Sequence, residues 1–234
     1  MKLVKLGAAA LITIVIVAGI AIPTSPEPTS WFQFPVIPGL EEKARNIFFH
    51  VPTAWTTVVA FLVSLYYGAR YLRTRQADDD IRSVSAASLG FMFCFLATIT
   101  GSIWAKFNWG SFWNWDPRET SIFILLLIYG AYFALRSSLE VEEMRAKLSA
   151  VYSIVAGLTV PFFIFVMPRI MSGLHPGAKG DASGSTPVAQ LHMPPNMLTV
   201  FLLSLFGFTL LFVWMLNVRV RLARIEYQQS THHA

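Results

Sequence analysis

The sequence predicts an all-α integral membrane protein with six transmembrane helices. Its 234 residues are 55% hydrophobic and only 13% charged, whereas soluble domains carry about 25% charged residues. Long uncharged or nearly uncharged runs recur along it, and a membrane-spanning helix needs about 20 such residues. No segment between these runs is long enough for a soluble domain. We therefore expect residues 1–234 to form a single polytopic membrane domain.

Six apolar runs give the expected helices in order along the chain. Five are long enough to cross a hydrocarbon core, and they cover residues 7–22, 54–72, 84–104, 149–168 and 197–217. The sixth, 120–136, is slightly short. The charged segment 137–148 follows it, and we expect a solvated helical connector there that could extend this sixth helix.

The first run, 7–22, has two interpretations. Lys2 and Lys5 precede it and a Pro/Ser/Thr-rich stretch follows, as in a cleaved signal peptide. Its apolar core is longer than that of a usual signal peptide, so we favour a retained anchor. Cleavage would not change the side on which the other loops lie.

The distribution of basic residues predicts the topology. Positive charge concentrates in cytoplasmic loops, and twelve of the 18 lysines and arginines fall on one side if both termini are cytoplasmic. The six on the other side are Lys43, Arg45, Lys106, Arg118, Arg169 and Lys179. The net charge of +5 is therefore mostly a topological signal. No basic stripe gathers on a soluble face, so we expect no nucleic-acid partner.

Three of the five histidines fall on the predicted outer side. They are His50, just before the second span, and His175 and His192 in the loop after the fifth; His232 and His233 end the chain. A histidine at a membrane boundary often only bonds a backbone carbonyl. Two on the same side and at a similar depth could instead ligate haem iron.

The outer loop of about residues 105–119 is rich in tryptophan. It contains NWGSFWNWDPRET, residues 108–120, and such residues concentrate at membrane interfaces, so a structural aromatic belt is one interpretation. If the loop is helical, Trp109 and Trp113 share a face with Phe112. If it is extended, Trp113 and Trp115 share one. Either arrangement predicts an aromatic platform for a flat ligand.

The residues after the tryptophans are typical of a helix start. Asp116 can be the N-cap, Pro117 the first helical residue and Glu119 the partner in a capping box. Arg118 would then lie in the first turn near the outer surface, where it could meet a carboxylate of a ligand. The lone cysteine, Cys94, lies within the third span, and we expect it to be a packing residue.

Three segments of the chain resemble those of a known protein family. W-G-x-x-W-x-W-D over residues 109–116 is similar to the tryptophan-rich "WWD" signature of haem-handling proteins of cytochrome c maturation. RNIFFHVPTAW around His50 and GLHPGA around His175 resemble the two histidine segments of the CcmC-like branch. With six spans, the resemblance covers nearly the whole chain. The tryptophan motif alone would mark only the CcmC–CcmF–CcsA superfamily.

The resemblance implies a function in a bacterial inner membrane. Haem b would lie non-covalently on the outer face, on Trp109, Trp113 and Trp115, with His50 and His175 as its two axial ligands. It would then pass to a periplasmic, CcmE-like haem chaperone. The other implied partners are a small CcmD-like subunit, CcmA- and CcmB-like transporter subunits and membrane lipid. The implied role is haem handling, and we do not expect an enzyme.

Two departures from the family pattern keep alternatives open. WDPRET leans toward the WDPKET of the system II protein CcsA, so a component of a cytochrome c synthase is an alternative, and the aromatic belt is another. CcsA-like proteins are usually longer and carry histidines inside their spans, which this chain does not. His192 is a second candidate ligand. We favour His175 because GLHPGA matches the family and QLHMPP does not.

Overall fold

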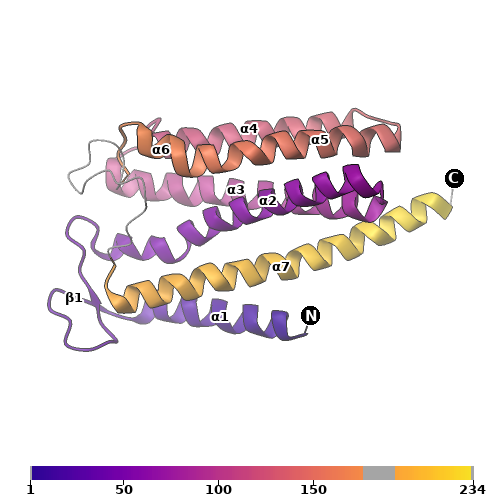
Figure 1. Ribbon diagram of the computed structural model, residues 1–234. Helices are drawn as coiled ribbons and strands as arrows, with labels where there is room; N and C mark the ends of the chain where they lie inside the picture. Colours follow the sequence, from indigo (N-terminus) through magenta and orange to yellow (C-terminus); the bar gives the residue numbers. More distant parts are fainter. Residues whose placement is uncertain (1, 176–192, 233–234) are drawn as a thin grey trace.

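The chain folds as a bundle of long helices (Figure 1). The computed structural model describes residues 2–175 and 193–232, and side chains as far as Gln229. The long helices are α1 (Lys2–Ala21), α2 (His50–Thr74), α3 (Ala77–Trp109), α4 (Pro117–Ser137), α5 (Glu142–Pro161) and α7 (Pro195–His232). The shorter elements are β1 (Thr24–Ser25), β2 (Phe34–Pro35), the 3₁₀ helix η1 (Glu41–Phe48), the π-helical turn η2 (Phe162–Val166) and α6 (Met167–Ile170).

Six helical segments among the described residues are long and apolar enough to span a membrane. This confirms the predicted fold class, and each predicted run lies inside one of them, except that the first, 7–22, extends one residue past Ala21. The fifth span is continuous from Glu142 to Ile170 because η2 and α6 extend α5. The prediction that Cys94 packs inside the third span is also confirmed, since its side chain is fully buried.

The predicted helical connector at 137–148 is helical from Glu142 onward, as the start of α5, but it does not extend α4. α4 ends at Ser137, and α5 begins only at Glu142. The N–H of Ser138 donates back to Ala134 and closes α4, whereas Val141 is extended. Glu142 and Glu143 then start a new helix, where the positive end of the helix dipole favours carboxylates. The sixth span instead gains its length at its other end, from Pro117 onward.

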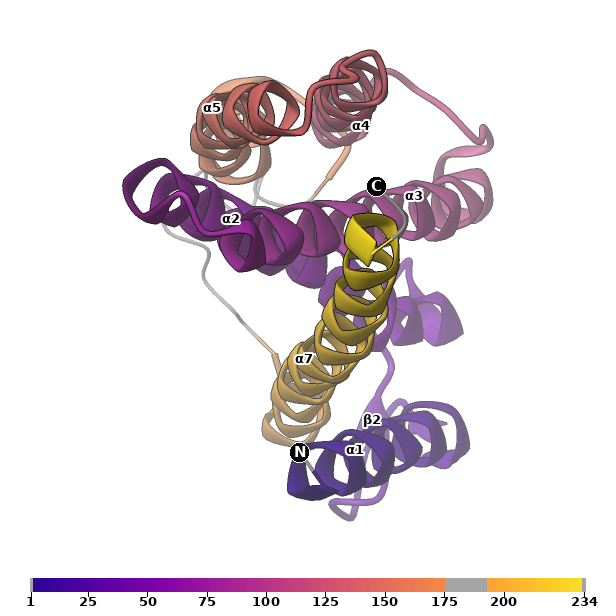
Figure 2. The ribbon, with the colours of Figure 1, turned by 90° about the vertical axis from the view of Figure 1, so that its right-hand side faces the viewer.

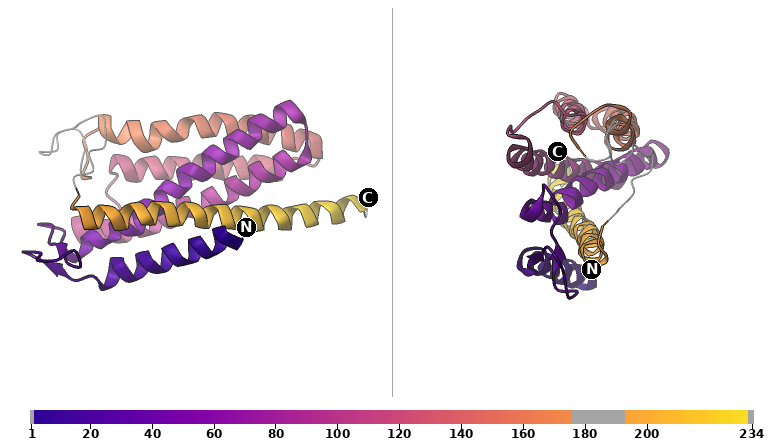
Figure 3. Two further views of the ribbon diagram at one scale, coloured as in Figure 1. Left: turned by 60° about the horizontal axis from the view of Figure 1, so that its bottom comes forward. Right: turned by 90° about the vertical axis from the view of Figure 1, so that its left-hand side faces the viewer.

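The helices form three layers when they are viewed along the bundle (Figure 2). α2 and α3 lie in the middle and pack on each other; α4 and α5 cover one side, and α7 and α1 lie on the other. α7 runs well past the N-terminal end of α1 (Figure 3). α1 packs mainly on α7, so most of its apolar surface faces outward.

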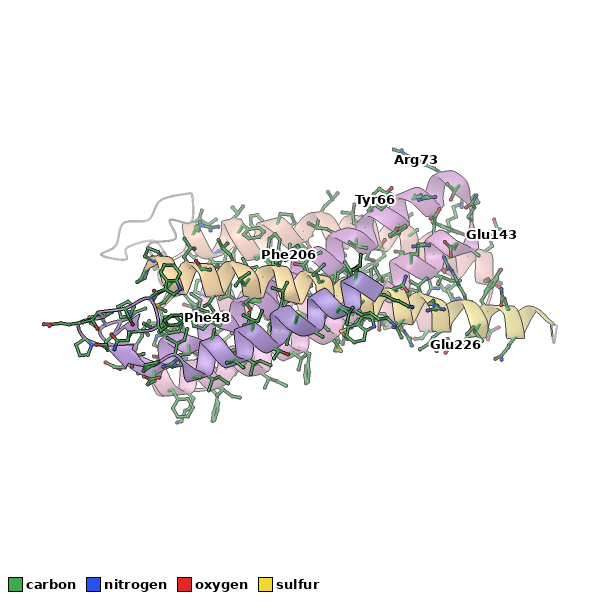
Figure 4. All side chains as sticks on the ribbon, turned by 90° about the horizontal axis from the view of Figure 1, so that it is seen from below. Phe48, Tyr66, Arg73, Glu143, Phe206 and Glu226 are labelled. Atoms are coloured by element: carbon green, nitrogen blue, oxygen red, sulfur yellow. The ribbon has the colours of Figure 1, made fainter. Side chains whose placement is uncertain are left out.

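The two ends of the bundle carry different elements. β1, β2 and η1 lie at the end of the bundle opposite the C-terminus, and both termini point away from them (Figure 1). Charged side chains such as Arg73, Glu143 and Glu226 gather at the terminal end, whereas Phe48 lies toward the loop end (Figure 4). We call the end with β1, β2 and η1 the loop end.

A stacked aromatic pair packs the middle of the bundle, and a glycine makes room for it. The rings of Phe61 on α2 and Tyr129 on α4 stack with nearly parallel planes. Phe61 can reach this position because Gly90 on α3 leaves room, since a Cβ there would lie 2.6 Å from the ring. Small residues at helix contacts are typical of membrane bundles because they let backbones approach closely.

A second cluster fixes the first loop at the loop end. Phe34 on β2 and Phe48 on η1 are fully buried, with ring centroids 5.5 Å apart, and they pack against α1 and α7. Ser204 on α7 donates a hydrogen bond to the carbonyl of Phe48. Because η1 leads directly into α2, these contacts also fix where His50 begins that helix.

Candidate functional site

The candidate site lies at the loop end, where three segments of the chain meet. His50 comes from the start of α2, and residues 100–117 come from the last turns of α3 and its loop to α4. His175 follows α6 and is the last described residue before the gap. His192, the alternative ligand, lies outside the described residues.

Asp116 connects two of these segments. It caps α4 as the sequence predicts: Oδ1 accepts from the N–H of Arg118, and the capping box with Glu119 is complete. Its Oδ2 accepts from the N–H of Leu174 at 2.6 Å, and its Oδ1 lies 2.6 Å from Nδ1 of His175. The side chain of Asp116 is 1% exposed. A helix cap therefore also positions a candidate ligand.

The loop before His175 approaches Asp116 closely because it contains a glycine. A Cβ at Gly173 would lie 2.7 Å from Oδ2 of Asp116 and 2.9 Å from Cδ of Pro117. A Cβ atom essentially never lies that close to another heavy atom, so any larger residue would push the two segments apart. The close contact between the His175 segment and the start of α4 thus depends on Gly173.

The environment keeps Asp116 ionised. Burial raises its pKa, but the hydrogen bond from His175, the charge of His175 and the N–H groups of Arg118 and Leu174 outweigh burial. Together they lower the pKa of the Asp116 carboxyl to about 2. At neutral pH the carboxylate is therefore a charged acceptor beside the imidazole.

Two tryptophans surround the His175 ring. Trp109 meets it edge to face with ring centroids 4.7 Å apart, and Trp104 lies nearly parallel to it at 6.1 Å. The two indoles also pack on each other at 5.1 Å. Each such aromatic pair contributes about 0.5–1.5 kcal/mol beyond the burial of area. Both tryptophans come from the last turns of α3, so the site has a rigid aromatic wall.

His50 lies against α3, less than two turns from Trp104. Its Nδ1 is 2.9 Å from Oγ1 of Thr100. A Cβ at Gly101 would lie 2.9 Å from its ring, so this glycine leaves room for the imidazole. His50 therefore packs on the same stretch of α3 that carries Trp104 and Trp109.

The other two tryptophans of the motif lie outside this wall. Gly110 ends α3 in a left-handed conformation, so Trp109, Phe112 and Trp113 do not share a helical face as one alternative predicted. Trp113 and Trp115 do meet, edge to face with ring centroids 5.8 Å apart, as the extended alternative predicted, but the backbone is not regularly extended there. Trp115 is itself left-handed, with φ +55°, and 70% exposed. A non-glycine residue in that conformation is uncommon.

The basic residues near the site differ in what they already contact. Lys106 donates to the carbonyl of Gly110, and Arg45 donates to that of Gly19. Within the described residues, the Arg118 guanidinium makes no hydrogen bond or ion pair, and Asp116 attracts it only through space. Arg118 is half-buried. Among the described residues it is the one of the three whose charged group has no hydrogen-bond partner.

Sequence reasoning missed four contributors to this site. Thr100 and Trp104 stand four positions apart on α3, the spacing that puts two side chains on one helix face. That spacing could have placed them beside the motif. Gly101 and Gly173 contribute only by leaving space for a neighbouring side chain. This role is visible only in the folded structure. Two cavities, of about 590 and 500 Å³, lie elsewhere, one at the terminal end and one beside α1.

Comparison with known proteins gives a consistent set of relatives. The profile of the family described as "Heme exporter protein C" (CcmC) matches residues 3–234. "Heme exporter protein C" of Paracoccus denitrificans is 33% identical over 177 residues, which are 76% of this chain and 71% of the relative. That of Haemophilus influenzae is 30% identical over 78% of this chain and 72% of its own. "Cytochrome c biogenesis protein CcsA" of Spinacia oleracea is 33% identical over 110 residues, 47% of this chain and 33% of the relative.

Proposed function

The chain belongs to the heme exporter protein C (CcmC) family, and on that premise we propose that it binds haem at its loop end and delivers it to a CcmE-like haem chaperone. A role in cytochrome c maturation agrees with the names of its relatives, which are heme exporters and cytochrome c biogenesis proteins. Haem here is cargo, bound without a covalent bond and then passed on. We propose no enzymatic step for this chain.

The observation that carries the proposal is the meeting of His50, His175 and the Trp104–Trp109 wall. The two imidazoles come from segments 125 positions apart and pack on the same last turns of α3, His50 beside Thr100 and Gly101 and His175 beside the tryptophan wall. Each has its Nδ1 occupied by a neighbouring oxygen. Imidazoles are common axial ligands of haem iron. We therefore assign His50 and His175 as the two ligands of a haem b.

Other residues of the site suit the rest of the macrocycle. The Trp109 and Trp104 rings offer an apolar edge, and the free donors of Arg118 can pair with a propionate, since guanidinium matches carboxylate geometry. The exposed Trp113 and Trp115 then lie where haem or its acceptor can meet them. None of these contacts is covalent, so haem can leave.

The membrane orientation follows from the charge pattern. The terminal end carries most of the basic residues, and basic residues mark the cytoplasmic side. We therefore place both termini in the cytoplasm, the site at the periplasmic face and the protein in a bacterial inner membrane. The proposed partners are a small CcmD-like subunit and the CcmA- and CcmB-like transporter subunits.

The test is the absorption spectrum of the purified protein, alone and mixed with a CcmE-like apo-chaperone. We expect a low-spin, six-coordinate haem that moves to the chaperone on mixing. The His50→Ala, His175→Ala double variant should lose that spectrum, and His192→Ala should keep it. If the double variant keeps the wild-type spectrum, the ligand assignment fails.

The resemblance to CcsA supports a second candidate function, a component of a cytochrome c synthase, beside haem delivery. A 110-residue stretch that is 33% identical to a CcsA protein favours a component of a cytochrome c synthase. Expression in a strain that lacks all other maturation components separates the two proposals. Restored cytochrome c would support the synthase, and its absence despite bound haem would support delivery.

A further inference from the structure

The two histidines differ in what holds their Nδ1 atoms. Beside His175 is Asp116, whose two carboxylate oxygens already accept the N–H groups of Arg118 at 2.9 Å and Leu174 at 2.6 Å. An oxygen surrounded by donors acts as an acceptor. Nδ1 of His175 therefore carries the hydrogen in its 2.6 Å contact with Asp116. Its Nε2 keeps the lone pair.

Beside His50 is a neutral hydroxyl. Thr100 has one hydroxyl hydrogen, and Oγ1 donates it to the backbone, with the carbonyl of Leu96 at 2.9 Å and that of Ala97 at 3.2 Å. This bond back to the preceding turn is usual for threonine in helices. With its hydrogen directed to the backbone, the hydroxyl is the acceptor for Nδ1 of His50, 2.9 Å away. Nε2 of His50 also keeps its lone pair.

Both imidazoles therefore offer the lone pair of Nε2 to iron, but the two Nε2 atoms differ in basicity. A carboxylate that accepts from the distal N–H of a ligating histidine fixes the ring and raises its basicity. Charge-assisted hydrogen bonds are also about twice as strong as neutral ones. Asp116 gives His175 this support, whereas Thr100 gives His50 only a neutral acceptor.

We infer that His175 is the retained ligand of the haem and His50 the ligand that leaves first. This inference rests on the proposed function, because it needs both histidines on the iron. In the exchange, the bond from Nε2 of His50 to iron breaks and an incoming donor atom forms the new bond with its own lone pair. No electron and no proton leaves the site. His175, held by Asp116, Trp104 and Trp109, keeps the haem in place meanwhile.

The first test compares single variants reconstituted with haemin. His50→Ala should keep several-fold more haem per protein than His175→Ala, in a five-coordinate state. If the two retain equal amounts, or His175→Ala retains more, the inference is overturned. If wild-type protein binds no haem, or both variants keep its spectrum, the proposed function fails along with it.

The second test reads the iron–histidine bond itself. In ferrous His50→Ala protein, resonance Raman should give a lower iron–histidine stretching frequency once Asp116→Asn is added. A purely structural role of Asp116 would change the amount of haem but not that frequency. An unchanged frequency counts against the inference.

The third test does not depend on Asp116. Thr100→Val should speed the replacement of an axial ligand by cyanide several-fold in the ferric protein, because His50 loses its partner. Thr98→Val is the matched control, since Thr98 is on the same helix and, within the described part of the chain, its hydroxyl bonds only the carbonyl of Cys94. An equal cyanide rate in Thr100→Val and wild type overturns the assignment of His50 as the leaving ligand.

Discussion

The Asp116 carboxylate lies 2.6 Å from the His175 ring, although 59 positions separate the two residues in the chain. The same carboxylate begins α4 and accepts from the N–H of Leu174. The position of the histidine is therefore tied to the position of a transmembrane helix. The buried side chain of Asp116 therefore couples a displacement of either one to the other.

Substitutions of Asp116 should separate its role as a cap from its role beside His175. Asp116→Asn keeps a capping oxygen, whereas Asp116→Ala loses about 1 kcal/mol of helix stabilisation. We expect Ala to lower the melting temperature more than Asn, and both to weaken haem retention. Thermal unfolding in detergent and haem per protein measure the two effects. If Asn retains haem as well as wild type does, the charge beside His175 has no role.

The pKa of Asp116 predicts how this link responds to acid. Its folded pKa, about 2, lies below the usual value of 3.8. A carboxyl with a depressed pKa contributes stability above its unfolded pKa and loses it as the pH falls through the folded one. The loss from Asp116 should therefore fall between about pH 4 and 2. Haem release at higher pH would have to come from other groups, and an acid titration of Asp116→Asn beside wild type checks this.

Gly173→Ala should separate the His175 segment from α4. The new methyl group would lie 2.7 Å from Oδ2 of Asp116, so the loop must shift and the contact with His175 must lengthen. We expect a several-fold loss of haem retention with normal membrane insertion. Gly130→Ala is the control, because nothing lies within 4 Å of a Cβ there. Equal retention in the two variants would contradict the close approach.

Arg118→Gln should weaken haem binding through the propionates. Arg118 has free donors, whereas Lys106 already donates to Gly110, so Lys106→Gln should have the smaller effect. Haem affinity measured with protohaem and with its dimethyl ester isolates the cause. The loss in Arg118→Gln should disappear with the ester, which has no carboxylates. A loss of the same size with both haems would show that Arg118 acts in another way.

The sequence predicted those parts of the protein that depend on neighbouring residues. Hydropathy located six spans because each needs only length and apolar composition, and the capping box at Asp116 was predicted because its residues are three apart. The conformation of the tryptophan loop was not predicted, because Gly110 and Trp115 adopt left-handed conformations that interrupt both a regular helix and a regular strand. The contacts of Asp116 with His175 and of Thr100 with His50 join segments 59 and 50 positions apart. No local pattern encodes such pairs.

The tryptophans of the loop should not be equivalent. Trp109 packs on His175, whereas Trp115 is 70% exposed. We expect Trp109→Ala to reduce haem retention more, and Trp115→Ala to reduce mainly the rate of transfer to the apo-chaperone. Trp31→Ala, at an exposed tryptophan of the first loop, is the control for loss of an interfacial ring. Equal retention and transfer rates in all three variants would support the aromatic belt instead.

An ion pair at the terminal end should set stability without affecting the site. Arg136 on α4 donates twice to Asp80 on α3, at 2.8 and 2.6 Å, and both side chains are less than one-fifth exposed. Arg136→Gln leaves Asp80 largely buried without its partner, and breaking a buried pair costs about 3–5 kcal/mol. We expect a clear fall in melting temperature and an unchanged haem spectrum. Arg73→Gln, at an exposed arginine of α2, should change neither. A shifted haem spectrum in Arg136→Gln would mean that the two ends of the bundle are coupled.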